Sequence, residues 1–152
     1  MVDLAMVASK CYYVFGSAGG FSIKKLLLPT MAASARLKEL YEQPTYNGMN
    51  FSNHQWWQPA ENEASGANRS RIPVKDPYSL LKSEGQDAGA FLDGNSLVAD
   101  GGDAIVAYDT LQRADLDPMI RNQIQTSLLR YCELDTLAMV MIVQAWQEFL
   151  EQ

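Results

Sequence analysis

The C-terminal third of the chain has the clearest pattern of hydrophobic and polar positions. Asp117-Pro118 is a typical helix start, because aspartate accepts hydrogen bonds from the first N–H groups and proline favours the first helical position. Apolar residues then recur every three or four positions from Ile120 to Phe149. The pattern predicts either one long helix or two helices joined near residues 131–135. No glycine or proline forces a break, but the width and length of the apolar stripe favour a bend.

The first 41 residues predict shorter elements. Residues 2–15 are apolar and aromatic, and their pattern leaves strand and helix both open. Ser22 is placed as the N-cap of a short helix over Ile23–Leu28. Pro29 is expected to end that helix, because the residue before a proline is pushed out of helical geometry. A second helix is predicted over Met31–Tyr41, which is rich in good helix formers.

The middle of the chain loses periodicity. Residues 42–75 are interpreted as an irregular, exposed and mobile insertion, and the apolar patch at residues 77–81 as the segment that docks it on the core. A helix is expected over residues 103–111. The length suits one domain over residues 1–152 and is too short for two.

The net charge of −6 conceals a basic first half. Residues 1–75 contain eight Lys/Arg and five Asp/Glu (+3), whereas residues 76–117 contain two and nine (−7). The acidic total argues against wrapping nucleic acid by charge alone, but it allows a local phosphate contact and a carboxylate-bound metal. Cys11 and Cys132 predict free thiols in a reducing cytoplasm. The chain has no apolar run of the roughly 18 residues needed to span a membrane, so no membrane partner is expected.

Two groups of residues carry candidate chemistry. Tyr131 and Asp135 are four positions apart, so a helix places both on one face. A carboxylate there can bind a divalent cation, and the phenol can hydrogen-bond a metal-bound water; the more common alternative is a half-buried tyrosine and a solvated or capping aspartate. Lys24 and Lys25 follow a glycine-rich turn at a helix start, where N–H groups and positive charge favour phosphate; the more common alternative is two solvated lysines on an amphipathic helix.

The segment Tyr131-Cys132-x-x-Asp135-Thr136 resembles the third motif of the tyrosine-type 3′–5′ exonucleases, such as RNase D and the proofreading domains of family-B polymerases. Further blocks, in order, resemble an uncharacterised bacterial domain family assigned to the same RNase H-like exonuclease fold; they fall within residues 16–29, 76–81, 100–108 and 129–140. The resemblance implies an α/β fold, of which this chain covers mainly the helical C-terminal half.

For individual residues the resemblance implies the following roles. Asp135 would hold Mg²⁺ or Mn²⁺, Tyr131 would orient the attacking water, and Lys24, Lys25 and Ser22 would contact the substrate, a DNA or RNA strand end. The activity would be metal-dependent 3′–5′ exonuclease-like processing of nucleic acid.

One departure from the family limits this expectation. The family's early Asp-x-Glu and its second-motif acid would precede Met1, and Asp3 resembles a neighbouring position that is not a metal ligand. Two divalent ions need several carboxylates to offset their repulsion, so the chain alone is expected to be catalytically incomplete. The alternative is a non-catalytic remnant or protein-interaction module. In both cases exposed apolar faces predict self-association, or a partner or upstream segment that completes the sheet.

Overall fold

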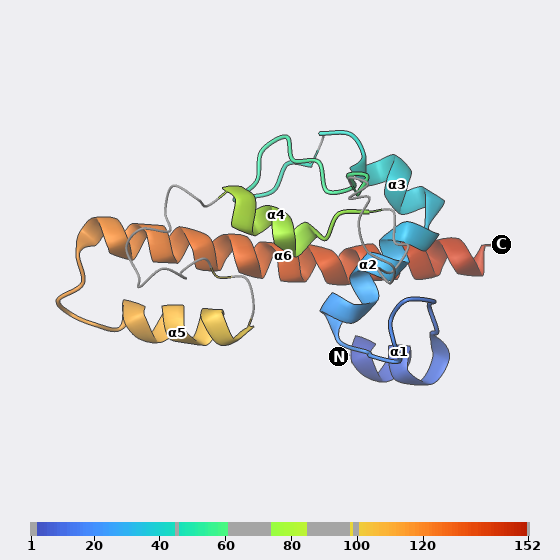
Figure 1. Cartoon of the computed structure of the whole chain (residues 1–152), viewed down its shortest axis with the longest axis horizontal. Coiled ribbons are helices and arrows are strands. Elements are labelled where there is room, and N and C mark those ends of the chain that lie inside the picture. The colour runs from blue at the N-terminus through green and yellow to red at the C-terminus, as the bar shows by residue number, and fades with distance from the viewer. Residues whose placement is uncertain (1–2, 45, 61–73, 85–97, 99–100, 152) are drawn as a thin grey trace, which may run out of the picture.

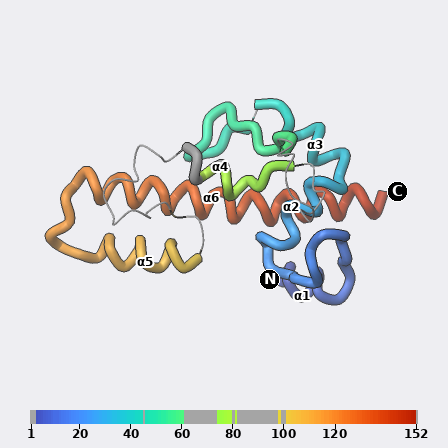
Figure 2. The backbone as a smooth tube through the Cα atoms, viewed as in Figure 1, coloured from blue at the N-terminus to red at the C-terminus, as the bar shows by residue number. Residues whose placement is uncertain are grey.

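A computed structural model describes residues 3–44, 46–60, 74–84, 98 and 101–151 of the chain, and one long helix organises them (Figure 1). Helix α6 (Pro118–Leu150) has 33 residues, and α2, α3, α4 and α5 all pack against it. Figure 2 shows α5 beside the first half of α6, α4 near its middle, and α2 and α3 beside its second half. The shorter helices are α1 (Leu4–Cys11), α2 (Ile23–Ala33), α3 (Ala35–Tyr41), α4 (Pro77–Glu84) and α5 (Gly101–Leu111).

The structure confirms the predicted start of α6 at Asp117-Pro118. The Asp117 carboxylate accepts hydrogen bonds from the backbone N–H groups of Met119 (2.8 Å) and Ile120 (3.3 Å), and Pro118 takes the first helical position. Of the two alternatives, the single long helix is confirmed, because α6 continues through residues 131–135 without interruption, and Figure 1 shows no sharp bend along it. Its broad apolar stripe needs no bend, since different short helices cover successive stretches of it.

The N-terminal boundaries differ from the predicted ones at Pro29. Helix α2 begins after Ser22 as expected, but it continues through Pro29 to Ala33. Burial of Pro29 and its apolar neighbours offsets the hydrogen bond that the proline cannot donate. The break falls at Ser34, whose hydroxyl accepts a hydrogen bond from the Leu37 N–H (3.0 Å) and caps α3.

The open choice for residues 2–15 is settled in favour of a helix over Leu4–Cys11. The Asp3 carboxylate accepts hydrogen bonds from the N–H groups of Ala5 (2.9 Å) and Met6 (3.3 Å). These bonds satisfy two of the first-turn donors, so Asp3 is the N-cap of α1.

The expected α/β class is wrong for the described part of the chain, which is mostly helical. Its extended pairing is limited to two isolated bridges, Tyr46 with His54 and Pro59 with Val74, and no sheet is present there. The helices bury their apolar faces on α6 instead, so the core is formed by helix-on-helix packing. None of the described helices combines the length and apolar character that crossing a membrane requires.

Residues 46–60 form a compact loop around a tryptophan. Trp56 is fully buried (0% exposed), with the ring centroids of His54 at 4.0 Å, Phe51 at 4.8 Å and Tyr46 at 5.9 Å. Such tilted and edge-on contacts add to the stabilisation from burial of the ring area. Trp56 therefore holds the loop together, while Trp57 links it to the helices by donating hydrogen bonds to the carbonyls of Met31 (3.2 Å) and Tyr41 (2.8 Å).

A carboxylate on α6 anchors the same loop. Glu133 accepts hydrogen bonds from the Tyr46 hydroxyl (2.9 Å), the Asn50 N–H (2.8 Å) and the Asn50 side-chain amide (2.7 Å). Gly48 lies so close that an added Cβ would be 1.7 Å from Glu133 Oε1, which explains the glycine. The remainder of the expected mobile insertion, residues 61–73, lies outside the described residues.

Candidate functional site

Four side chains from three helices meet beside the middle of α6, and we call them the Lys24 cluster: Lys24, Tyr78, Tyr131 and Asp135. The Lys24 ammonium lies 4.7 Å from the ring centroid of Tyr78 and 5.3 Å from that of Tyr131. The two rings are 6.3 Å apart, and the Tyr78 hydroxyl donates a hydrogen bond to Asp135 Oδ1 at 2.5 Å. Cation–π attraction and a charge-assisted hydrogen bond thus join α2, α4 and α6.

The helical spacing of Tyr131 and Asp135 places both residues in this cluster, but their side chains differ in exposure. Tyr131 is buried (7% exposed), whereas Asp135 and Lys24 are intermediate in exposure. The phenol that contacts the Asp135 carboxylate is that of Tyr78, which is also buried.

Tyr78 is the residue that the sequence reasoning missed. It falls in the short apolar patch at residues 77–81, for which the sequence predicts only a docking role, and it lies in the first turn of α4. Asp76 fixes this turn, because its carboxylate accepts a hydrogen bond from the Tyr78 N–H (3.0 Å). The Asp-Pro pair before Tyr78 is a helix-start signal that could have been recognised, but the contact with Asp135 spans 57 positions.

Burial and the adjacent carboxylate determine the ionisation of Tyr78. Desolvation raises the pKa of its hydroxyl, and the hydrogen bond to Asp135 raises it further, well above the ordinary value of 10.0. Tyr78 therefore remains a neutral hydrogen-bond donor near neutral pH. Its hydroxyl proton is donated to Asp135, whose carboxylate has further lone pairs that can accept a second hydrogen bond.

The other two predicted substrate contacts lie at the N-terminus of α2. Ser22 is exposed and occupies the N-cap position, but its hydroxyl makes no capping hydrogen bond. Lys25 is also exposed, and its stem packs over Gly20, where an added Cβ would be 2.1 Å from Lys25 Cδ. The two lysines therefore diverge, since Lys24 extends to α4 and α6 whereas Lys25 folds back on the turn.

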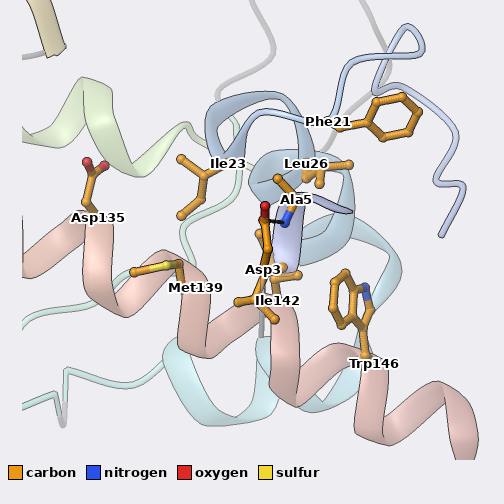
Figure 3. A pocket seen from close by; sticks show the side chains of 10 residues that line it. Asp3, Ala5, Phe21, Ile23, Leu26, Asp135, Met139, Ile142 and Trp146 are labelled. Atoms are coloured by element: carbon orange, nitrogen blue, oxygen red, sulfur yellow. Dashed lines mark hydrogen bonds between the residues drawn. The ribbon is translucent and has the colours of Figure 1, made fainter. Parts of the chain in front are cut away.

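A cavity of about 620 Å³ lies beside Asp135, between α1, α2 and α6. Most of its wall is apolar, and Asp3 and Asp135 are the acidic residues among its described lining. In Figure 3, Asp135 lies next to α4 while Asp3 lies farther along, beside Ala5. Two residues with other roles therefore also line the cavity: Asp135, a member of the Lys24 cluster, and Asp3, the N-cap of α1.

The described residues do not fit the two-metal site that the sequence resemblance implies. Mg²⁺ and Mn²⁺ prefer several oxygen ligands, whereas Asp135 is the single acid of the Lys24 cluster and Asp3 is engaged as a helix cap. Within residues 3–44, 46–60, 74–84, 98 and 101–151, no group of three His, Cys, Asp or Glu side chains could hold a metal ion. We therefore derive no chemical step through a metal.

Comparison with known proteins adds no family assignment: no family model matches the chain, and no curated protein or solved structure matches it significantly.

Proposed function

We propose that the chain binds the end of a DNA or RNA strand and forms the helical portion of a metal-dependent 3′–5′ exonuclease-like site that is catalytically incomplete without further residues. The observation that carries this proposal is the Lys24 cluster. It joins the Tyr131–Asp135 pair, predicted from the motif, to a predicted phosphate contact from a separate helix.

The N-terminus of α2 supports the phosphate part of the proposal. The first N–H groups of a helix and its dipole attract anions, and here Ser22, Lys24 and Lys25 add a hydroxyl and two positive charges. A strand backbone at this end of α2 would be within reach of Lys24, whose contact with Tyr131 leads to Asp135. Lys24 and Lys25 thus steady the strand, while Asp135 and Tyr131 face its terminal residue.

The chemistry available to the described residues supports binding without hydrolysis. Asp135 offers one carboxylate, and the further carboxylates of a two-metal site would have to come from elsewhere. The proposal places the protein in the cytoplasm, where the exposed free thiols of Cys11 and Cys132 stay reduced.

The test measures binding of labelled single strands by fluorescence anisotropy over a range of salt concentrations. Lys24→Ala is expected to weaken binding and to lower the slope of log affinity against log salt by about 1, as for one lost phosphate contact. The matched control is Lys38→Ala. Lys38 lies on α3, and its ammonium is also placed over an aromatic ring, 5.0 Å from the ring centroid of Trp57. Equal effects of the two substitutions, or no binding at all, would contradict the proposal.

A manganese-dependent nuclease assay on the same strands tests whether the exonuclease-like site is catalytically incomplete. The chain is expected to bind the strands and leave them intact. Release of terminal nucleotides that persists after Asp135→Asn would overturn the role given to Asp135.

A second candidate function, a protein-interaction module, is favoured by one observation on α5. Ile105, Val106 and Tyr108 are 72%, 67% and 64% exposed, although α5 packs against α6 and buries Ala107 and Thr110. Neighbouring exposed apolar side chains are typical of contact surfaces. This candidate predicts that sedimentation shows self-association of the chain and that Ile105→Glu reduces it; a monomer at all concentrations would contradict self-association.

A further inference from the structure

The cavity beside Asp135 has a lining that discriminates between ligands by charge. Its walls come from three helices: Leu4 and Ala5 of α1, Ile23 and Leu26 of α2, and Met139, Ile142 and Trp146 of α6. Two acidic residues, Asp3 and Asp135, also line it, and no lysine or arginine is among the described lining residues. Asp135 Oδ1 is hydrogen-bonded to Tyr78 of α4, and Lys24 lies over the Tyr78 ring outside this lining. An apolar chamber with acidic groups is therefore available to a ligand.

Aromatic neighbours hold the ring of Trp146, a lining residue of the cavity, in place. The ring of Tyr12 lies edge-on to Trp146, with the centroids 5.3 Å apart, and stacks on Phe149 at 6.2 Å. The Tyr12 hydroxyl is hydrogen-bonded to Thr30 Oγ1 (3.1 Å), which ties this aromatic group to α2. The wall is thus formed before any ligand enters, which lowers the entropic cost of binding.

Hydrogen bonds from neighbouring groups hold both carboxylates in place. Asp3 Oδ1 accepts hydrogen bonds from two N–H groups at the start of α1, and Asp135 Oδ1 accepts one from Tyr78. An anion in the cavity would be repelled by both groups and would find no basic side chain in the described lining to offset its desolvation. A cation with an apolar body finds both a charge partner and an apolar surface.

We propose that this cavity binds a small organic cation, with an apolar or aromatic body and one protonated amine or amidine group. The volume of about 620 Å³ lies in the range of small-molecule sites. The inference goes beyond the proposed function, because nucleic acid strands are polyanions and Lys24, which would contact them, is not among the lining residues.

The experiment compares three probes that share one apolar body: 3-phenylpropylamine, 3-phenylpropanol and 3-phenylpropionate. Binding to the full chain is followed by ¹H–¹⁵N NMR and calorimetry near neutral pH. The amine is expected to bind most tightly and the carboxylate most weakly, with the largest amide shifts in α1, the start of α2 and residues 135–146 of α6. Equal affinities of the amine and the carboxylate, or no shifts with the amine at millimolar concentration, would overturn the proposal.

Isosteric variants separate local charge from net charge. Asn is as good an N-cap as Asp, so Asp3→Asn keeps the start of α1, and Asp135→Asn keeps an acceptor for the Tyr78 hydroxyl. Each is expected to weaken amine binding about five-fold, as for one partly screened ion pair, and to leave the alcohol unaffected. Asp109→Asn, on the exposed side of α5, changes the net charge equally and is expected to alter neither affinity.

A third variant tests the location. Ala5 is exposed and lines the cavity, so Ala5→Leu is expected to fill part of the space and weaken the amine and the alcohol alike. Unchanged amine binding in Ala5→Leu, or an equal loss in Asp109→Asn, would overturn the proposed site. Strand binding that depends on Lys24 is measured separately, so loss of the cation site leaves the proposed function standing.

Discussion

The two halves of α6 are held by their neighbours in different ways. In the second half, residues 131–150, buried apolar side chains alternate with acceptors that bind donors from distant segments. In the first half, residues 118–130, α5 is the covering helix, and two arginines link α6 to other segments. Arg121 donates hydrogen bonds to the backbone carbonyls of Leu111 (2.6 Å) and Arg113 (2.6 Å) at the end of α5, and the Arg130 guanidinium lies 4.7 Å from the ring centroid of Phe51. The same helix therefore has a well-packed region and a thinly covered one.

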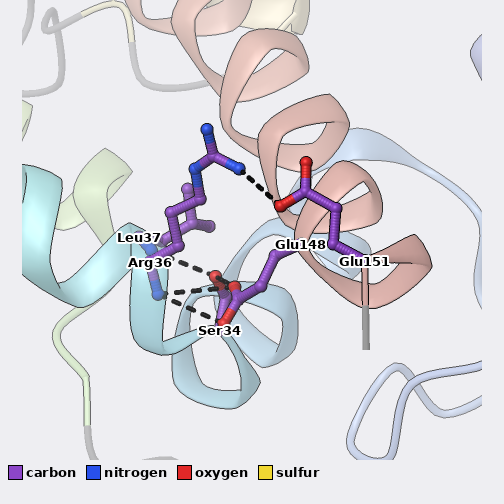
Figure 4. Close-up of polar contacts among 5 residues, drawn as sticks. All are labelled: Ser34, Arg36, Leu37, Glu148 and Glu151. Atoms are coloured by element: carbon purple, nitrogen blue, oxygen red, sulfur yellow. Dashed lines mark hydrogen bonds and ion pairs between the residues drawn. The ribbon is translucent and has the colours of Figure 1, made fainter.

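The acceptors of the second half bind the loop at residues 46–50, α4 and α3. Glu133 binds the loop at residues 46–50, Asp135 binds Tyr78 of α4, and Gln144 accepts a hydrogen bond from the Tyr41 hydroxyl (2.9 Å) of α3. Glu148 accepts hydrogen bonds from the Ser34 hydroxyl and the Arg36 N–H (Figure 4). The comparison teaches that shape and polar contacts together specify the second half, whereas the first half leaves apolar surface uncovered on α5.

Among substitutions that test this difference between the two halves, the largest loss of folding free energy is expected in the core of the second half. Leu134→Ala removes a fully buried side chain (0% exposed) and is expected to lower the free energy of unfolding by about 2–5 kcal/mol. Met119→Ala, at an exposed position in the first half, is expected to change it by less than about 0.5 kcal/mol. Urea unfolding followed by circular dichroism measures both, and similar losses would show that the two halves do not differ in packing.

A smaller effect is expected at the Glu133 anchor. Glu133→Ala leaves the Tyr46 hydroxyl and two Asn50 donors without their acceptor, which should cost about 1–3 kcal/mol. Its neighbour Cys132→Ala, at an exposed position, serves as the control. Hydrogen exchange should speed up at residues 46–56 in Glu133→Ala, and unchanged exchange there would contradict the anchoring role of Glu133.

The ionisation of Tyr46 gives a prediction that depends on pH. Burial and Glu133 raise the pKa of Tyr46 from 10.0 to about 12, so the folded state holds this proton more tightly than the unfolded state. The stabilisation is present below pH 10 and is lost as the pH rises to about 12. Tyr46→Phe is expected to leave the tyrosinate absorbance of the native chain at pH 11 nearly unchanged; a drop equal to one full tyrosinate would show an unshifted group.

The smallest effect is expected at the exposed end of the second half. Arg36 and Glu151 form an ion pair at 3.5 Å, with side chains 44% and 72% exposed. Because such pairs are screened by solvent, Arg36→Ala should change the free energy of unfolding by no more than about 1 kcal/mol. A larger loss in thermal unfolding would mean that this end of α6 is held by its charges rather than by Ser34 and Glu148.

Sequence reasoning succeeded where the signal was local. The start of α6 at Asp117-Pro118 and the start of α2 after Ser22 both follow from residues within one turn of the boundary. It failed at Pro29, where burial of neighbouring side chains outweighed a local rule, and in the α/β class, where a resemblance outweighed the helical pattern. For the candidate site, it proposed Tyr131, Asp135 and Lys24, but it gave Tyr78 no role in the chemistry.

The residues around Ser22 and Asp117 predict where α2 and α6 begin, and periodicity predicts which residues share a helical face, because both signals depend on a few adjacent side chains. Only the tertiary structure decided that Asp135 binds Tyr78, that Lys24 and Lys25 diverge, and that Asp3 and Asp135 border one cavity. These pairings join positions far apart in the chain, and their geometry depends on how all the packed helices fill space together.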